Sequence, residues 1–343
     1  MKGLSILNKI VFFFNLIFAF LLLLACLVPH ISTEHIAFLS ILSLTVPVLV
    51  GVNFLFLFFW ILKGRRQMLL SLSILVLGYL TMGAFVKFDF SDKKNKVSPD
   101  LRVLSYNVRT FNKDGHIDSP RVFEDIKDLV DSQDPDIVCF QEVGYLRRKE
   151  YVNYPYKHLE FIKNGGHLLL GIFSKYPIID AQLLNFPKSY NNGAYADILF
   201  KNDTIRIYDL HLESLGITPG TGVLRSEASD KLYRRVTGRF KKQEEQAKLV
   251  REHMQTVDYK TIICGDFNNT QFSNVYHIIK GDRQDTFIEE GNGLGRTYDF
   301  LGIPLRIDFI FADNSFEVLE HKNFNVKYSD HFPVMASFRI KGD

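Results

Sequence analysis

Three long apolar runs within the first 86 residues limit what this chain can fold into more than any other feature. They cover residues 10–28, 36–62 and 68–86. A helix needs about 20 apolar residues to cross roughly 30 Å of hydrocarbon. The runs therefore predict three transmembrane helices, in a membrane anchor at residues 1–86. Buried helices of a soluble protein are a weaker interpretation, because the runs leave no polar face toward water.

A cleaved signal is a second alternative for the first run, because residues 23–26 resemble a lipoprotein cleavage site. The two later runs would make cleavage less useful for anchoring. Basic residues set the predicted orientation, since Lys and Arg in short loops favour the cytoplasmic side. They flank the first run and separate the second from the third, whereas residues 29–35 contain none. The amino terminus is therefore predicted in the cytoplasm and everything after residue 86 outside it, on the periplasmic side if the source is bacterial.

Charge and cysteine content narrow the function of the remaining chain. Residues 1–86 carry a net charge of +4, which leaves −1 for the rest of the protein. Such a domain lacks the broad basic surface that non-specific duplex binding uses. The three cysteines, Cys26, Cys139 and Cys264, have no zinc-ligand spacing and lie in apolar runs. We expect them to be buried thiols without a disulfide.

Residues 87–100 are charged and small, which predicts a juxtamembrane linker, and a domain over residues 101–343 follows. Its strands and helices are mixed, and many strands with few long helices indicate two packed sheets covered by helices. Helices are predicted from Ser119-Pro120 to about Ser132 and from about Arg239 to Gln255. Strands are predicted at residues 101–107, 136–141, 168–174, 194–200, 204–212, 261–265, 306–311 and 334–340.

Polar side chains stand at the carboxyl ends of several of these apolar strands. Asn107 and Glu142 each follow a predicted strand, where side chains of neighbouring strands can converge. Mg²⁺ accepts a carboxylate, an amide oxygen and several waters. A solvated strand end is an equally good interpretation of Glu142 taken alone.

The sequence Gly265-Asp266-Phe267-Asn268 is more specific, because it follows a buried strand and begins with a residue that permits a sharp turn. Asp266 is suited to orient or deprotonate water, and Asn268 to donate a hydrogen bond to phosphate. A β-turn in which these side chains bind their own backbone is the alternative.

Two histidines complete the set of candidate residues. Asp330 and His331 lie on a turn, which leaves Asp330 as a metal ligand and His331 for the substrate. His211 ends another strand, and Asp308 is available as an imidazole partner. One histidine at a strand end is more often structural, but two of them beside these acids favour catalysis.

In this order, the polar blocks resemble the metal-dependent endonuclease/exonuclease/phosphatase superfamily over about residues 101–340. The blocks are residues 106–108, 141–143, 211–214, 265–269, 306–309 and 329–333. The resemblance implies a four-layered α/β/β/α sandwich, similar to that of pancreatic-type deoxyribonucleases, with the site at one edge of two facing sheets. Together with the apolar runs, this gives the predicted fold class, which is such a sandwich preceded by three transmembrane helices.

The resemblance also implies roles for the matching residues. Asn107, Glu142 and Asp330 would surround Mg²⁺ or Mn²⁺; Asp266 and Asn268 would surround the attacking water and phosphate; His211 and His331 would bind phosphate and transfer protons, with Asp308 orienting His331. The reaction would be single-step hydrolysis of a phosphoester. An acid that supports the first histidine in deoxyribonucleases has no clear counterpart, and Glu213 is the candidate substitute. His167 and the basic residues of the segment 215–238 are possible substrate contacts, although a solvated surface is the simpler interpretation.

The sequence therefore predicts a membrane-anchored, metal-dependent phosphoesterase whose partners are the bilayer and a phosphodiester substrate. That substrate is a phospholipid, a nucleic acid or a soluble metabolite, and no protein partner is indicated. An extracytoplasmic nuclease is one alternative. A non-catalytic membrane scaffold with the same fold is another, and the intact set of acids and histidines argues against it.

Overall fold

The structure is a computed structural model that describes residues 4–88, 99–144, 153–161, 169–217 and 229–342. The chain forms two compact units. The helical unit comprises Met1–Phe85, Glu227–Glu244 and Asn269–His277. The two-sheet unit comprises Val86–Ser226, Glu245–Asn268 and Ile278–Asp343. Two later segments are therefore grouped with the amino-terminal helices, and the division at residues 86 and 101 stays a prediction.

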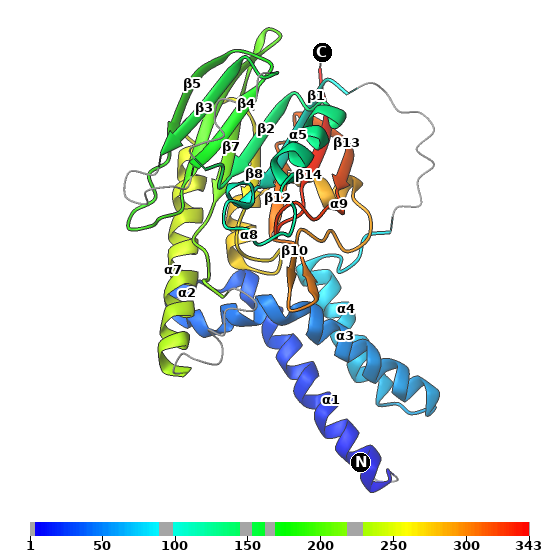
Figure 1. The fold of residues 1–343 in the computed structure, drawn as a ribbon. Helices are drawn as coiled ribbons and strands as arrows, with labels where there is room; N and C mark the ends of the chain where they lie inside the picture. Colours follow the sequence, from blue (N-terminus) through cyan, green and yellow to red (C-terminus); the bar gives the residue numbers. More distant parts are fainter. Residues whose placement is uncertain (1–3, 89–98, 145–152, 162–168, 218–228, 343) are drawn as a thin grey trace. The chain divides into compact units, whose positions relative to one another are not determined.

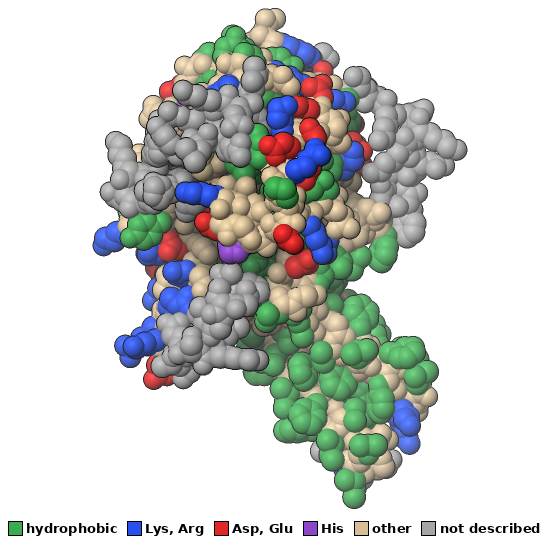
Figure 2. Space-filling view, viewed as in Figure 1, with side chains coloured by type: hydrophobic (Ala, Val, Ile, Leu, Met, Phe, Trp, Pro, Cys, Tyr) green, Lys and Arg blue, Asp and Glu red, His purple; other side chains and the backbone are tan. Residues whose placement is uncertain are grey.

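Apolar helices make up most of the helical unit (Figure 1). They are α1 (Ile6–Ala25), α2 (Thr33–Ile36), α3 (Ile41–Leu62) and α4 (Met68–Met82), with short 3₁₀ turns at Val28–His30 and Ala37–Ser40. Many of their large apolar side chains are exposed, for example Leu55, Leu62 and Leu80. Figure 2 shows apolar side chains covering this part of the surface. Such a surface is consistent with membrane anchoring.

The prediction of three spanning helices is wrong in its number. Only Ile6–His30 and Thr33–Leu62 are long and apolar enough to cross a membrane, within the described residues. The third helix, α4, has 15 residues, and at 1.5 Å per residue it falls short of roughly 30 Å. It ends at Gly83, whose φ of 83° is left-handed. The apolar sequence continues to Val86, but the helix does not.

Two six-stranded sheets form the core of the two-sheet unit. The first has the order β13-β14-β1-β2-β4-β3 and the second β5-β6-β7-β8-β12-β9. The strands of the first are β1 (Leu101–Asn107), β2 (Ile137–Gln141), β3 (Tyr156–Phe161), β4 (Leu169–Ser174), β13 (Phe316–Asn323) and β14 (Val334–Ile340). Those of the second are β5 (Ile178–Leu183), β6 (Gly193–Phe200), β7 (Asp203–His211), β8 (Lys260–Asp266), β9 (Gln284–Asp285) and β12 (Asp308–Ala312). A hairpin of β10 (Tyr298–Phe300) and β11 (Ile303–Leu305) is separate.

One apolar core joins the two sheets. It contains fully buried side chains of the first sheet, such as Val103 and Ile137, and of the second, such as Ile207 and Ile262. A second cluster packs α5 (Val122–Gln133) on the first sheet. The mixed α/β fold with two sheets is thus confirmed, whereas the full four-layered order stays a prediction.

Strand register places the polar strand ends together. β1 is parallel to β2, with Asn107 opposite Gln141. β7 is parallel to β8, with His211 opposite Asp266. Because parallel strands end at the same edge, the residues that follow them meet there. The antiparallel partner β12 begins at this edge, with Asp308 opposite Asp266.

Several helix boundaries in the structure differ from the predicted ones. α5 begins at Val122 with Arg121 as its N-cap, so Ser119-Pro120 does not open the helix. The long helix α7 runs over Ser229–Met254, and begins ten residues before the predicted start. Lys87 at the start of the predicted linker forms an isolated bridge with Gly293. His167, and residues 218–228 of the basic segment, lie outside the described residues.

Candidate active site

Asp266 lies at the centre of the polar groups at this sheet edge. It is 1% exposed. Its Oδ2 accepts a hydrogen bond from Asn107 Nδ2 at 3.1 Å, and lies 3.7 Å from His211 Nε2 and 3.6 Å from His331 Nε2. The imidazole distances exceed ordinary hydrogen bonds, so the two rings flank the carboxylate without being tightly bound to it.

The backbone around Asp266 requires glycine at the preceding position. Gly265 has a φ of 132°, and a Cβ there would lie 1.9 Å from the carbonyl oxygen of Leu210. The close approach holds β8 beside β7. After the strand, Asn268 adopts a left-handed φ of 50° and its amide N–H donates to Asp266 Oδ1 at 2.7 Å. The Asn268 side chain donates to the Leu212 carbonyl at 3.0 Å, so this turn fixes the orientation of the Asp266 carboxylate.

His331 and Asp308 form the pair that the sequence predicts. His331 Nδ1 lies 3.0 Å from Asp308 Oδ2, and both residues are buried. This contact fixes the ring so that Nε2 faces Asp266. The ring of Tyr298 packs at 5.0 Å from the His331 ring and limits its movement further.

Burial and neighbouring charges shift the pKa values of these groups in opposite directions. Burial opposes protonation of His331, but the carboxylates of Asp308 and Asp266 outweigh it and raise the pKa of His331 to about 10. Burial, only partly offset by His331, raises the pKa of Asp266 to about 6. The pKa of His211 is lowered by burial. One imidazole therefore favours the protonated form and the other the neutral form, which suits one to stabilise negative charge and the other to accept a proton.

Two of the three predicted metal ligands are in contact, since Asn107 Nδ2 donates to Glu142 Oε1 at 3.4 Å. The Asn107 side-chain oxygen accepts a hydrogen bond from the Arg109 N–H at 3.1 Å. Burial raises the pKa of the Glu142 carboxyl, and the charge of Asp330 acts in the same direction, which shows that these two acids repel each other. A divalent cation between them would relieve that repulsion, and their oxygens are donors that Mg²⁺ or Mn²⁺ accepts.

A second group of donors also lies close together. Asp266, Asp308 and His331 each offer one ligand atom within 4.8 Å of the others. The hydrogen bond from His331 Nδ1 to Asp308 leaves Nε2 facing Asp266, which is a usual arrangement for a metal-binding histidine. This buried group could therefore bind a metal, and Glu142 and Asp330 offer further oxygen donors of the kind that Mg²⁺ or Mn²⁺ accepts.

Sequence analysis missed Arg109. Its Nη1 lies 2.7 Å from Asp330 Oδ2, so a cation faces one of the predicted ligands. The residue belongs to four consecutive residues with positive φ, from Arg109 to Asn112. No glycine or asparagine-glycine pair marks this turn, and only its position two residues after Asn107 could have indicated it.

Glu213, which the sequence offered as the acid that supports His211, has a different hydrogen-bond partner. Its carboxylate accepts a hydrogen bond from Ser189 Oγ at 2.5 Å, and its backbone N–H donates to Gln246. It acts on His211 through charge, as the weakest of the contributions to the pKa of that ring.

The two facing sheets and a buried group of acids, amides and imidazoles at their edge define a phosphoesterase-type protein. A family model described as endonuclease/exonuclease/phosphatase family matches residues 104–331, so this chain belongs to that family. Residues 8–85 match a model for a domain of unknown function. A search of curated proteins found no match.

Solved structures share the fold at low identity. TDP2 from D. rerio complexed with a single-strand DNA product is 16% identical with a TM-score of 0.52, covering 70% of this chain and 98% of that one. A mannosyl-6-phosphatase from Bacteroides thetaiotaomicron is 20% identical with a TM-score of 0.51, covering 70% and 100%. The human Nocturnin catalytic domain with bound sulfate is 14% identical with a TM-score of 0.53, covering 70% and 94%. These similarities show that the fold is shared. The similar proteins differ from one another in activity.

Proposed function

We propose that this protein is a membrane-anchored, divalent-metal-dependent phosphoesterase that hydrolyses a phosphodiester outside the cytoplasm. The observation that carries the proposal is the position of Asp266, a buried carboxylate held between two imidazoles and facing Asn107. A carboxylate with a raised pKa beside a cationic imidazole is suited to orient water toward a bound phosphate.

Each residue has a role that its contacts support. Asp266, fixed by the turn at Asn268, orients the attacking water and accepts its proton. His331, held by Asp308, stabilises the charge that develops on the phosphate oxygens. His211, whose ring favours the neutral form and whose Nε2 also lies 3.6 Å from Glu142 Oε1, accepts a hydrogen bond or a proton beside Asp266.

The proposed metal ligands are Asn107, Glu142 and Asp330. When bound there, Mg²⁺ or Mn²⁺ would polarise the phosphoryl oxygen as a Lewis acid. Arg109 pairs with Asp330 and would orient that carboxylate. Since both side chains of the pair are about one-third exposed, the ion pair contributes little to stability.

The proposed location combines the basic residues around the apolar helices, which favour a cytoplasmic amino terminus, with an odd number of crossings. Two helices meet the length of a membrane span. If only these two cross, the domain lies in the cytoplasm, so an extracytoplasmic domain requires that α4 crosses as well. A carboxy-terminal alkaline phosphatase fusion tests the topology. Activity of the fusion is expected for an extracytoplasmic domain, and activity of a cytoplasm-dependent fluorescent fusion would reverse the assignment.

Phospholipid is the favoured substrate class because an anchored enzyme is confined near lipid headgroups. A nuclease is the second candidate, favoured by the likeness to a protein solved with a DNA product. A phosphomonoesterase is a further candidate on the likeness to a sugar phosphatase. The scaffold alternative predicts binding without turnover.

The test is a substrate panel with the full-length protein in detergent, because residues 227–244 and 269–277 belong with the helical unit. Phosphatidyl diesters in mixed micelles, single-stranded DNA and phosphorylated sugars are compared, with and without EDTA. We expect lipid hydrolysis that EDTA abolishes and Mg²⁺ restores. Cleavage of DNA alone would select the nuclease, and no turnover of any substrate would favour the scaffold.

A further inference from the structure

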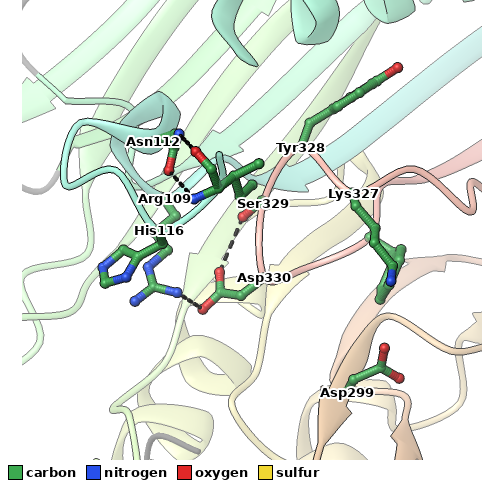
Figure 3. Close-up of a pocket in the computed structure, with 10 residues that line it drawn as sticks. Arg109, Asn112, His116, Asp299, Lys327, Tyr328, Ser329 and Asp330 are labelled. Carbon is green, nitrogen blue, oxygen red and sulfur yellow. Dashed lines mark hydrogen bonds and ion pairs between the residues drawn. The ribbon is translucent and has the colours of Figure 1, made fainter. Parts of the chain in front are cut away.

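An open cavity of about 400 Å³ borders the site on the side of Asp330. Its walls come from the segment after Asn107 and from the turn before His331. Figure 3 shows the Arg109 guanidinium and the His116 ring together beside Asp330, and Lys327 on the other side above Asp299. Asp330 is the one lining residue that belongs to the proposed catalytic set. The cavity is therefore next to the scissile position but distinct from it.

The carboxylates that line this cavity are paired with arginines, whereas its lysine is not paired with a carboxylate of the described residues. Asp330 is paired with Arg109 at 2.7 Å, and Asp299 with Arg296 at 3.3 Å. Within the described parts of the chain, no carboxylate lies at ion-pair distance from Lys327 or His116. The acids of the cavity are therefore neutralised, and Lys327 remains available to an anion.

The wall that carries Arg109 and His116 is held in place by specific hydrogen bonds. Thr110 N–H donates to the Glu142 carbonyl at 2.7 Å. Asn112 binds the backbone of Ile117 twice, donating to its carbonyl at 2.7 Å and accepting from its N–H at 2.9 Å. These contacts maintain four left-handed residues in succession, an uncommon conformation for side chains other than glycine. The cavity is thus a formed feature of this fold.

We infer that the cavity binds a second anionic group of the substrate, a phosphate or carboxylate on the alcohol portion next to the scissile phosphate. The inference rests on the proposed phosphoesterase function. Lys327 contacts the second anion directly, and Arg109, paired with Asp330, forms the facing wall. Tyr328 and Phe332 line the same cavity and pack against the short carbon chain between the two anions.

The experiment uses two 4-nitrophenyl phosphodiesters with the full-length protein in detergent and Mg²⁺. The second alcohol is propanol in one and 3-phosphopropanol in the other. We expect wild type to have a lower KM for the phosphorylated ester. Lys327→Glu should raise that KM about tenfold, since one phosphate contact is replaced by repulsion, and leave kcat/KM for the propyl ester within about twofold.

Lys322→Ala is the matched control. Lys322 is an exposed lysine that contacts Gln133 and does not line the cavity. Its substitution should leave both KM values unchanged. Equal effects of Lys327→Glu on both esters, or no effect on either, would overturn the inference while leaving the phosphoesterase function intact.

Calorimetric binding of propane-1,3-diyl bisphosphate and propyl phosphate decides the matter independently of turnover. The bisphosphate should bind wild type more tightly, and Lys327→Glu should remove the difference. If neither ester is hydrolysed but this difference is present, the cavity binds a second anion and the proposed function fails. If the two ligands bind equally well, the cavity inference fails.

Discussion

Two buried carboxylates, one in each unit, are surrounded in opposite ways. Glu244 in the helical unit is 2% exposed, and it accepts hydrogen bonds at 2.6 Å from Ser32 Oγ, from Thr33 N and Oγ1, and from Asn274 Nδ2. Asp266 in the two-sheet unit is as deeply buried, but it faces other titratable groups at 3.6 and 3.7 Å.

The comparison shows that burial alone does not identify a catalytic acid. Neutral donors at hydrogen-bond distance stabilise the charge of Glu244 and fix its position, which is the arrangement of a structural group. Asp266 instead lies among imidazoles whose own pKa values are shifted, an arrangement typical of functional sites. Removing Asp266 should therefore reduce activity, and removing Glu244 should reduce stability.

The largest expected effect is the loss of activity in Asp266→Asn. An amide of the same shape cannot accept the proton of water, so kcat should fall by at least about 10². The unfolding temperature should change little, because the amide oxygen can still accept the 2.7 Å hydrogen bond from the Asn268 N–H, and burial already disfavours the charged carboxylate. Initial rates and thermal unfolding in detergent measure the two effects.

Asp197→Asn is the control for that variant. Asp197 is buried in β6 and binds Arg206 at 2.6 and 2.7 Å, away from the site residues. Breaking this ion pair should lower stability while the folded protein keeps its activity. Full activity in Asp266→Asn would show that the assigned role is wrong.

The second effect concerns Glu244→Ala, which removes the acceptor of four hydrogen bonds, three of them buried. We expect the free energy of unfolding to fall by about 3 kcal/mol. Chemical denaturation in detergent measures it. Glu245→Ala is the matched control, since this neighbouring residue on α7 is exposed and should change stability by at most about 0.5 kcal/mol. Equal losses in the two variants would contradict a structural role for the Glu244 cluster.

Sequence reasoning could predict the catalytic cluster but not the cluster around Glu244. Asn107, Asp266 and Asp308 each lie in or next to an apolar strand. A polar residue at such a position differs clearly from its neighbours in the sequence. Glu244 lies in a stretch of Lys, Gln and Glu that has the composition of a solvated helix, and its partner Ser32 is 212 residues away. Nothing local in the sequence indicates that such a residue is buried.

Because a sequence pattern reports mainly on neighbouring residues, some other features of the structure were also mispredicted or missed. Hydropathy predicts a span to Val86, but the left-handed Gly83 ends α4 first. Arg109 was missed because the turn that directs it toward Asp330 has no glycine to mark it. Asn107 and Asp266 lie in different sheets, and the packing of one sheet on the other brings them together. The family resemblance supplied that proximity where spacing could not.

The smallest expected effect concerns Asp209, a third buried carboxylate. It accepts a hydrogen bond from one donor. Gln141 Nε2 donates to its Oδ1 at 2.6 Å, and its Oδ2 has no hydrogen-bond partner among the residues that the structure describes. Burial raises the pKa of Asp209 well above its ordinary value, only partly offset by Gln141. Burial likewise raises the pKa of the neighbouring Cys139 thiol. We therefore expect Asp209 to stay protonated in the folded protein while the unfolded chain loses the proton near pH 3.9.

Above that pH the folded state binds more protons than the unfolded state, so stability falls as pH rises toward the native pKa, by at most about 1.4 kcal/mol per pH unit. Asp209→Asn removes this titration and keeps the shape of the side chain. Its stability relative to wild type should increase as the pH rises above the unfolded pKa and should level off at the native pKa. Urea denaturation midpoints across this range measure the difference. Parallel pH profiles for the two proteins would mean that Asp209 ionises in the folded state as it does in the unfolded chain, and that one donor is sufficient to hold a charge in this core.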